Sequence, residues 1–288
     1  MSRKVAEGSL ARSLRDWQPG SVEMTRRVDP WFPAAFADLI GAPAAGDALP
    51  PLWHWFVLLD HPARSNTGED GHPADGPFLP PIPGRRRMFA GGRLRLEAPI
   101  PIGTDLSSRS SVSDVSVKTG RSGEMAFVTV RHELAVGGAT VGVEEQDIVY
   151  RSEPAGAPRR TPPAPETGLP EPAGEWRAEL ATDPVLLFRF SALTYNGHRI
   201  HYDRPYATRV EGYPDLVVHG PLLALLALEL PRRHAPDRSV RTVGYRLVRP
   251  AFIPSRIVSA GRVTGAGVEV VVGARGASPS LTATIGLA

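Results

Sequence analysis

Two groups of segments in which apolar and polar residues alternate constrain the fold of this chain most strongly. They lie at residues 93–102, 105–119, 124–136 and 139–151, and again at 239–253, 256–267, 268–276 and 280–288. Alternation with a period of two is typical of strands that bury one face. Glycines at 120, 123, 137 and 138 mark short turns between strands of the first group. Successive strands joined by short turns predict antiparallel sheets rather than β–α–β units.

One helix is predicted clearly, at residues 221–232 (PLLALLALELPR). Pro221 suits the first helical position, where its missing N–H costs little. Leucines surround this helix on nearly every side, which predicts that it is buried. A buried helix beside antiparallel strands indicates an α+β fold. Residues 29–41 and 49–61 are a less regular counterpart in the first half, and the apolar residues 185–190 (VLLFRF) are predicted to form a strand.

The proline-rich segment 152–174 divides the chain into two halves of similar size. Its seven prolines and three glycines favour an extended connector. Residues 93–101 (RLRLEAPIP) and 246–254 (RLVRPAFIP) both fit R-L-x-x-x-A-x-I-P, which favours an internal duplication. The predicted organisation is an N-terminal extension (1–29), a first domain (30–151), the linker (152–174) and a second domain (175–288).

Composition excludes several classes of function. The chain of 288 residues has a formal net charge of +3, and its arginines are scattered rather than gathered in the basic stripe typical of nucleic-acid binders. It has no cysteine, which excludes disulfides and thiolate chemistry. The polar N-terminus resembles no signal peptide, and no apolar run is long enough to span a membrane, so we expect a cytoplasmic protein that binds neither nucleic acid nor membrane.

Residues 193–207 (LTYNGHRIHYDRPYA) carry the most chemically versatile side chains. His201 is the candidate general base and acid, because histidine titrates near neutral pH; an exposed surface histidine is the alternative. Asn196 could hold a water molecule, although Asn-Gly is also a strong turn dipeptide. Asp203 could orient His201 or could simply be a solvated loop residue, because a separation of two residues leaves a direct bond open.

Five further residues are candidates for substrate binding. Arg199 and Arg204 could bind a carboxylate or a phosphate, with surface charge as the alternative. His219 and Gly220 precede the predicted helix, whose N-terminal N–H groups could polarise a carbonyl; an ordinary helix start is the alternative. Tyr195 is included with these candidates. His72 and its acidic neighbours in the polar residues 64–76 could bind a metal ion, but we interpret this segment as a solvated loop and predict no metal site.

Residues 188–207 (FRFSALTYNGHRIHYDRPYA) and 211–230 (EGYPDLVVHGPLLALLALEL) resemble the hydratase half of MaoC-like double hot-dog proteins. The sub-group of greatest similarity comprises 3-methylfumaryl-CoA (mesaconyl-C4-CoA) hydratases and related 3-hydroxyacyl-thioester dehydratases. In the first half, LPPLWHWFVLLDH, GPFLPPIPGRRRMFAGGRL, FVTVRHEL and EEQDIVYR resemble the N-terminal hot dog of the same sub-group. The resemblance implies a double hot-dog fold, in which each of two curved antiparallel sheets wraps a central helix.

The resemblance also implies reversible addition of water to the double bond of an enoyl thioester. The family's motif of an aspartate, four residues and a histidine falls on Asn196 and His201. With asparagine at the first position, only His201 could exchange the proton, while Asn196 would position the water. The N–H of Gly220 would hold the thioester oxygen. The resemblance implies no cofactor beyond the CoA or phosphopantetheine that the substrate carries.

Three alternatives stay open at this point. The chain could be a 3-hydroxyacyl-carrier-protein dehydratase of fatty-acid or polyketide assembly, with arginines around 85–87 binding the acidic carrier. It could be a thioesterase, although Asn196 lacks the carboxylate that such a reaction normally uses. It could also be a catalytically silent partner that binds acyl thioesters. A monomer and a homodimer are both compatible with the sequence.

Overall fold

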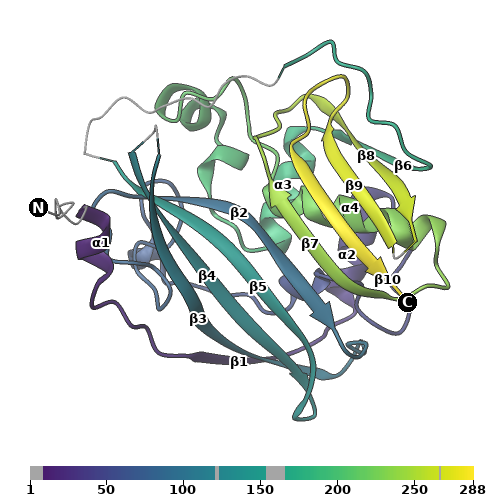
Figure 1. Ribbon diagram of the computed structural model, residues 1–288, viewed down its shortest axis with the longest axis horizontal. Coiled ribbons are helices and arrows are strands. Elements are labelled where there is room, and N and C mark those ends of the chain that lie inside the picture. The colour runs from purple at the N-terminus through teal and green to yellow at the C-terminus, as the bar shows by residue number, and fades with distance from the viewer. Residues whose placement is uncertain (1–8, 121–122, 154–165, 266) are drawn as a thin grey trace, which may run out of the picture.

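The structure, a computed structural model, describes residues 9–120, 123–153, 166–265 and 267–288. Its framework is an antiparallel sheet of ten strands in the order β1-β3-β4-β5-β2-β7-β10-β9-β8-β6 (Figure 1). The strands are β1 (Val22–Arg27), β2 (Arg85–Leu96), β3 (Asp105–Gly120), β4 (Gly123–Val136), β5 (Ala139–Ser152), β6 (Trp176–Thr182), β7 (Val240–Leu247), β8 (Ser255–Thr264), β9 (Gly267–Ala274) and β10 (Leu281–Leu287). The predicted antiparallel α+β architecture is therefore confirmed.

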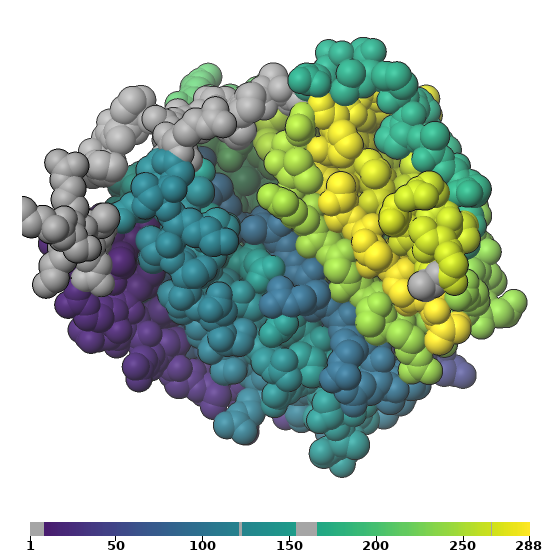
Figure 2. Space-filling model, in the orientation of Figure 1, coloured from purple at the N-terminus to yellow at the C-terminus, as the bar shows by residue number. Residues whose placement is uncertain are grey.

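The strand order supports the internal duplication. Counted outward from the centre, β2-β5-β4-β3-β1 on one side corresponds to β7-β10-β9-β8-β6 on the other. The two matching strands β2 and β7 pair at the centre, where Gly91 faces Arg246 and Arg93 faces Gly244. Gly91 has a φ of +155°, and a Cβ there would lie 2.4 Å from the carbonyl oxygen of Tyr245. Glycine thus lets the backbones of the two halves meet closely. Figure 2 shows the teal and yellow-green halves side by side.

The helices are α1 (Ser9–Leu14), α2 (Trp31–Ile40), α3 (Pro184–Leu193) and α4 (Gly220–His234), with short helical turns η1 (Trp53–Phe56), η2 (Arg64–Asn66), η3 (Arg199–His201) and η4 (Tyr206–Val210). Helices α2, α3 and α4 lie behind the sheet in the view of Figure 1, and α1 lies at its left edge. Helix α4 matches the predicted helix, and all ten residues from Leu222 to Pro231 are buried. It contacts strands β6 to β10, so the second half is a hot dog with its central helix.

The first half fills the corresponding space with α2 and η1. The rings of Phe36 and Trp53 meet edge to face, with centroids 5.0 Å apart. Glu144, a buried carboxylate on β5, fastens η1 to the sheet: it accepts hydrogen bonds from Trp55 and Gln146 and pairs with His54 at 2.6 Å. Phe190 of α3 lies 6.0 Å from Phe36, centroid to centroid, and so joins the cores of the two halves.

The prediction of a strand at residues 185–190 is wrong, because these residues lie in α3. Asp183 caps this helix by accepting a hydrogen bond from the N–H of Leu186, and Pro184 occupies the first turn. The buried positions 186, 187, 190, 191 and 193 follow a helical spacing that a short apolar run conceals.

The structure adds detail to two of the predicted segments, the extension and the linker. The predicted extension 1–29 contains β1, which pairs with β3 as an edge strand, and α1, whose Leu10 and Leu14 are buried in a small core cluster with Val128 of β4. Of the predicted linker 152–174, residues 154–165 lie outside the described residues, and the rest includes an isolated bridge between Thr167 and Ala277. Within the described chain, no helix is long and apolar enough to cross a membrane.

Candidate active site

His201 ends η3 and is buried, with 7% of its surface exposed. Its Nδ1 lies 2.7 Å from the carbonyl oxygen of Val217. A carbonyl can only accept, so Nδ1 carries the proton and donates it to this bond. In the neutral ring, Nε2 therefore holds a free lone pair. This orientation is the one that a general base requires, and the alternative of an exposed surface histidine is wrong.

The ring of His219 stacks on His201. The centroids lie 3.7 Å apart and the planes are inclined by 17°. His219 is fully buried, and its Nε2 forms a hydrogen bond of 2.9 Å with the hydroxyl of Ser191. Burial lowers the pKa of His201 to about 4 and holds the pKa of His219 well below its usual range. Both rings are therefore neutral at physiological pH, and His219 supports His201 through ring contact.

The N-terminus of α4 lies directly after this pair. His219 is the residue before the helix, and Gly220 is its first residue, followed by Pro221. The N–H groups of a helix's first turn have no partner within the helix. A Cβ on Gly220 would lie 2.6 Å from Cδ1 of Leu247, so glycine here makes room for the side chain of a neighbouring strand.

Asn196 forms a turn. Its Oδ1 accepts a hydrogen bond of 2.9 Å from the N–H of His198, and its own N–H donates to the carbonyl of Ser191. The turn that Asn196-Gly197 predicted is confirmed. This turn leads the chain from α3 into η3, and it thus sets the path of the residues before His201.

Asp203 does not orient His201, because its carboxylate is bound to other residues. Its Oδ2 accepts from Nε and Nη2 of Arg199, and its Oδ1 accepts from the N–H of Tyr206. The hydrogen bond from Arg199 and that from Tyr206 lower the pKa of Asp203, so it is a charged carboxylate. The carbonyl of Val217 takes the orienting role, because the turn of η3 directs Asp203 toward Arg199, four residues earlier.

The substrate-binding candidates are placed as follows. Arg199 also donates to the carbonyl of Glu69, and its guanidinium lies 4.0 Å above the ring of Tyr206, so it holds the loop together. Arg204 is half exposed and pairs with Asp215 at 2.8 Å. Tyr195 is 61% exposed and has a positive φ of 49°, at the end of the turn that follows α3.

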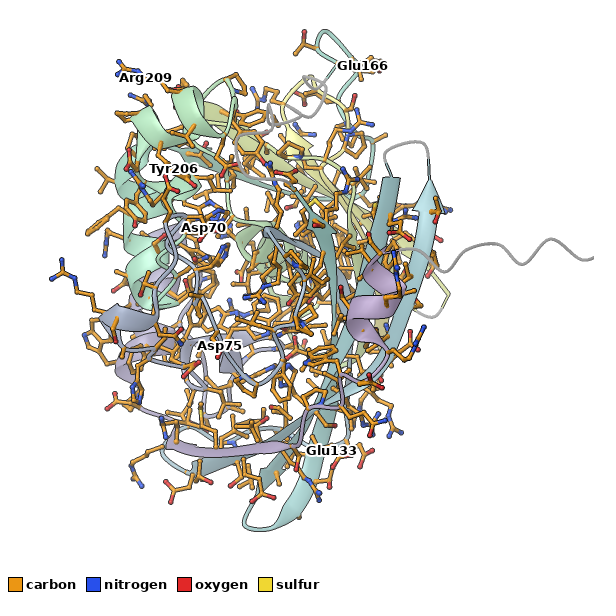
Figure 3. All side chains as sticks on the ribbon, turned by 90° about the vertical axis from the view of Figure 1, so that its left-hand side faces the viewer. Asp70, Asp75, Glu133, Glu166, Tyr206 and Arg209 are labelled. Atoms are coloured by element: carbon orange, nitrogen blue, oxygen red, sulfur yellow. The ribbon has the colours of Figure 1, made fainter. Side chains whose placement is uncertain are left out.

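A loop from the first half, residues 68–76, lies against this catalytic loop, which we define as residues 195–204. The N–H of Arg199 donates to the carbonyl of Asp70 at 2.9 Å. A Cβ on Gly71 would lie 1.8 Å from the carbonyl oxygen of Gly197, so the two backbones touch. The ring of His72 lies 4.0 Å from that of His198, centroid to centroid. Figure 3 shows Asp70 on this loop beside the segment that carries Tyr206.

Sequence reasoning therefore missed the contribution of the first half to the site. The polar sequence of residues 64–76 suggests a solvated loop, whereas Asp70 and His72 pack on the catalytic loop. Burial lowers the pKa of His198. Burial opposes ionisation of Asp70, but the interactions with His72 and His198 together outweigh it and lower the pKa of Asp70. By contrast, a surface recess of about 350 Å³ beside α2 is lined by residues such as Pro33 and Ala45 and includes none of the catalytic loop.

Comparison with known proteins agrees with this arrangement. Residues 52–253 match the family model of hydroxyacyl-thioester dehydratase type 2. The chain is 44% identical over 249 residues to mesaconyl-C(4)-CoA hydratase of Chloroflexus aurantiacus, and the match covers 86% of each chain. This similarity spans both halves and the loops that meet at His201.

Solved structures support the fold. HtdX from Mycobacterium tuberculosis superposes with a TM-score of 0.65 at 17% identity, covering 92% of this chain and 99% of that one. Another M. tuberculosis protein, described as a double hotdog fold, superposes with a TM-score of 0.56 at 16% identity, covering 94% and 96%. The double hot-dog prediction and the family resemblance are both confirmed. The chain belongs to the family of type 2 hydroxyacyl-thioester dehydratases.

Proposed function

We propose that this chain is a hydro-lyase that adds water reversibly to the α,β double bond of an enoyl-CoA thioester, with His201 as its general base and acid. The observation that carries the proposal is the state of His201, which is buried and neutral. Its Nδ1 is held by the carbonyl of Val217, so its Nε2 is free. Membership of a family of thioester dehydratases supplies the reaction class.

In the hydration direction, Nε2 of His201 takes a proton from water while the water oxygen bonds to Cβ. The electron pair of the double bond moves toward the thioester, and negative charge develops on its oxygen. The N–H of Gly220, in the first turn of α4, stabilises that charge. The imidazolium of His201 then returns its proton to Cα. One water is added in total, and one side chain serves both proton transfers.

Asn196 acts as a positioning residue in this scheme. Its Oδ1 holds the turn before His198, so its role is to set the catalytic loop and to help place the water. An amide can do this without exchanging a proton. The scheme needs no second carboxylate, which agrees with the engagement of Asp203 by Arg199.

The substrate proposed is a short branched enedioyl-CoA such as 3-methylfumaryl-CoA. The support is the identity of 44% with a relative named mesaconyl-C(4)-CoA hydratase, which extends over 86% of the chain. Such a substrate carries one free carboxylate besides its thioester. Arg204 is the last residue of the catalytic loop, is half exposed and is held by one ion pair to Asp215, and it is the candidate to meet this carboxylate.

Dehydration of a 3-hydroxyacyl thioester on a carrier protein is the second candidate, favoured by the description of the family that the chain matches. It is the same chemistry in reverse. Two of the three arginines suggested for carrier binding, Arg85 and Arg86, are engaged within the protein, however. Arg85 donates to the carbonyls of Pro80 and Ala74, and Arg86 pairs with Glu153 and with Glu211 at 2.9 Å. CoA is therefore the preferred carrier.

The test is incubation of the purified chain with 3-methylfumaryl-CoA, crotonyl-CoA and a matched 3-hydroxyacyl-carrier-protein, followed by mass spectrometry. Gain of one water by the CoA thioesters supports the proposal, and loss of water from the carrier-bound acyl group alone supports the second candidate. Release of free thiol with an unchanged double bond identifies a thioesterase and contradicts both.

A further inference from the structure

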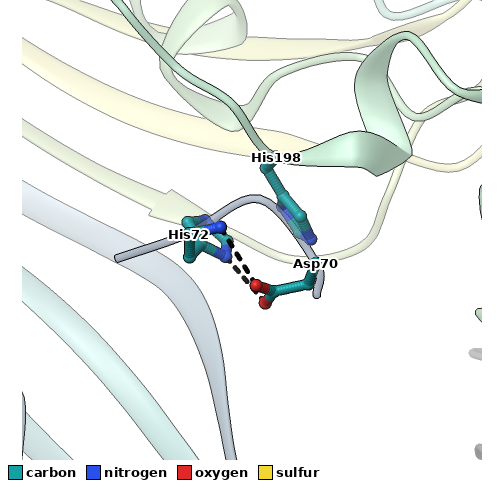
Figure 4. A group of neighbouring side chains, drawn as sticks. All are labelled: Asp70, His72 and His198. Atoms are coloured by element: carbon teal, nitrogen blue, oxygen red, sulfur yellow. Dashed lines mark hydrogen bonds and ion pairs between the residues drawn. The ribbon is translucent and has the colours of Figure 1, made fainter. Parts of the chain in front are cut away.

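Three side chains with metal-ligating groups meet where the two halves touch beside the catalytic loop. Asp70 and His72 come from the loop of the first half, and His198 comes from the catalytic loop (Figure 4). One ligand atom from each, a carboxylate oxygen or an imidazole nitrogen, lies within 4.8 Å of the other two. The chain thus brings together two imidazoles and one carboxylate from positions far apart in its sequence.

The loop around Asp70 is built so that it presents two ligands side by side. Oδ1 of Asp70 accepts from the backbone N–H of His72, and Oδ2 lies 3.0 Å from Nδ1 of the same residue. The N–H of Gly68 donates to the carbonyl of His72 and closes the turn. Two ligand atoms that each bind one metal ion at about 2.0–2.2 Å are separated from each other by roughly the distance found here between Oδ2 of Asp70 and Nδ1 of His72.

The donor atoms that a metal needs are available. Among the described residues, neither ring nitrogen of His198 forms a hydrogen bond to protein, and His72 uses only Nδ1, toward Asp70. Both imidazoles are half-buried rather than extended into solvent. A bound ion would replace the hydrogen bond between Asp70 and His72 with two metal bonds.

Imidazole nitrogen with one carboxylate is a donor set for borderline divalent metals and not for magnesium or calcium, which prefer oxygen ligands throughout. We propose that Asp70, His72 and His198 form a binding site for a divalent transition-metal ion of the zinc class, which fastens the loop of the first half to the catalytic loop. Water would complete the coordination, because the three side chains leave at least one position open.

The site lies next to His201, so a metal bound there would help to hold the catalytic loop in place. His198 is three residues before His201, and their rings lie 5.4 Å apart in an edge-to-face arrangement. The contact of Arg199 with Asp70 and the close approach of Gly71 to Gly197 already join the two loops. A metal would fix the same junction with stronger bonds and so hold η3 in place. This inference does not rest on the proposed hydratase activity.

The experiment uses the full chain without an affinity tag, stripped of metal with a chelator. Zn²⁺ is titrated against a competing chromophoric chelator, and Co²⁺ is titrated while its visible d–d absorption is followed. The variants are Asp70→Asn, which preserves shape, and His72→Ala. His61→Ala is the matched control, because it removes an exposed histidine from the same region of the chain. Melting temperature is measured with and without Zn²⁺, and circular dichroism confirms folding of each variant.

We expect one equivalent of Zn²⁺ to bind to the wild type and to His61→Ala and to raise the melting temperature of both. Affinity should fall more than about tenfold in Asp70→Asn and His72→Ala, and the Co²⁺ band should disappear. Equal affinity in all four proteins would overturn the proposal, as would the absence of stoichiometric binding in the wild type. Metal binding is read without any substrate, so its outcome is independent of the hydration assay.

Discussion

The imidazole rings of His201 and His219 are stacked face to face, with centroids 3.7 Å apart. Two protonated rings at this distance would repel each other strongly in a buried site. Burial already lowers the pKa of both, so each ring is neutral in the resting protein. The pair therefore keeps Nε2 of His201 as a base, and proton uptake during the reaction makes His201 the acid for the second step.

The first prediction concerns pH. Burial lowers the pKa of His201 to about 4, so the base is neutral throughout the range above that value. We expect the kcat/KM for hydration to stay level from neutral pH down toward 5 and to fall as pH passes through about 4. The measurement is initial rate against pH, with each sample returned to neutral pH to verify reversibility. An acid limb with a midpoint near 6.5 would indicate a solvated histidine instead.

The second prediction is that His201→Ala lowers the kcat by at least about a hundredfold, the usual contribution of a general acid and base. His201→Gln should be equally impaired, because glutamine can still donate to the carbonyl of Val217 but cannot exchange a proton. His61→Ala is the control. A correctly folded His201→Gln with wild-type turnover would remove His201 from the mechanism.

The strands were predictable because antiparallel strands with one buried face leave an alternating pattern in the sequence. Helix α4 was predictable because its leucines follow a proline suited to a helix start. Helix α3 was not, because its short apolar run is compatible with a strand as well. The one local signal for a helix was Asp183, which caps α3, followed by Pro184.

The candidate site was predictable only in its second half. His201 could be found from its residue type and neighbours, and the pairing of Asp203 with Arg199 follows the i, i+4 spacing of a helical turn. The packing of Asp70 and His72 on the catalytic loop depends on how the two halves pair through β2 and β7. No local pattern carries that information, because the contact is set by tertiary structure.

The third prediction separates two roles of Asn196. Asn196→Asp retains the oxygen that accepts from the N–H of His198, so the turn should persist. We expect its kcat/KM to stay within about tenfold of the wild type or to rise, since the carboxylate can share proton transfer. Asn196→Ala loses the turn and should be less active than Asn196→Asp. An inactive Asn196→Asp with an intact fold would show that the amide itself is required.

The fourth prediction concerns stability. Burial opposes ionisation of Glu144, but the interactions with His54, His132 and Gln146 together outweigh it and lower the pKa of Glu144. A carboxylate whose pKa is lower in the folded than in the unfolded protein stabilises the fold at pH values above its pKa in the unfolded chain. This stabilisation is lost as the pH falls through its pKa in the folded protein. Glu144→Gln should reduce the free energy of unfolding by about 3 kcal/mol at neutral pH, because it breaks a buried pair.

The difference between Glu144→Gln and the wild type should be constant down to about pH 4.5 and shrink below it. Urea unfolding followed by circular dichroism at several pH values measures it. Arg95→Gln is a suitable control, because it removes an exposed ion pair between Arg95 of β2 and Glu97, which directly follows that strand. A pH-independent difference would mean that packing, rather than charge, accounts for the loss.

The fifth prediction tests the backbone N–H of Gly220. Only a substitution by proline removes this group, because every other residue keeps a backbone N–H. Gly220 is the first residue of α4, where proline is tolerated, but any Cβ there meets Leu247. Both variants are therefore built on Leu247→Ala, which clears the space. Gly220→Ala retains the N–H and should keep most of the activity of that background. Gly220→Pro should lose about a hundredfold or more in kcat, the usual effect of removing one oxyanion donor, with KM little changed. Equal rates in the two double variants, with equal melting temperatures, would place the thioester oxygen away from the N-terminus of α4.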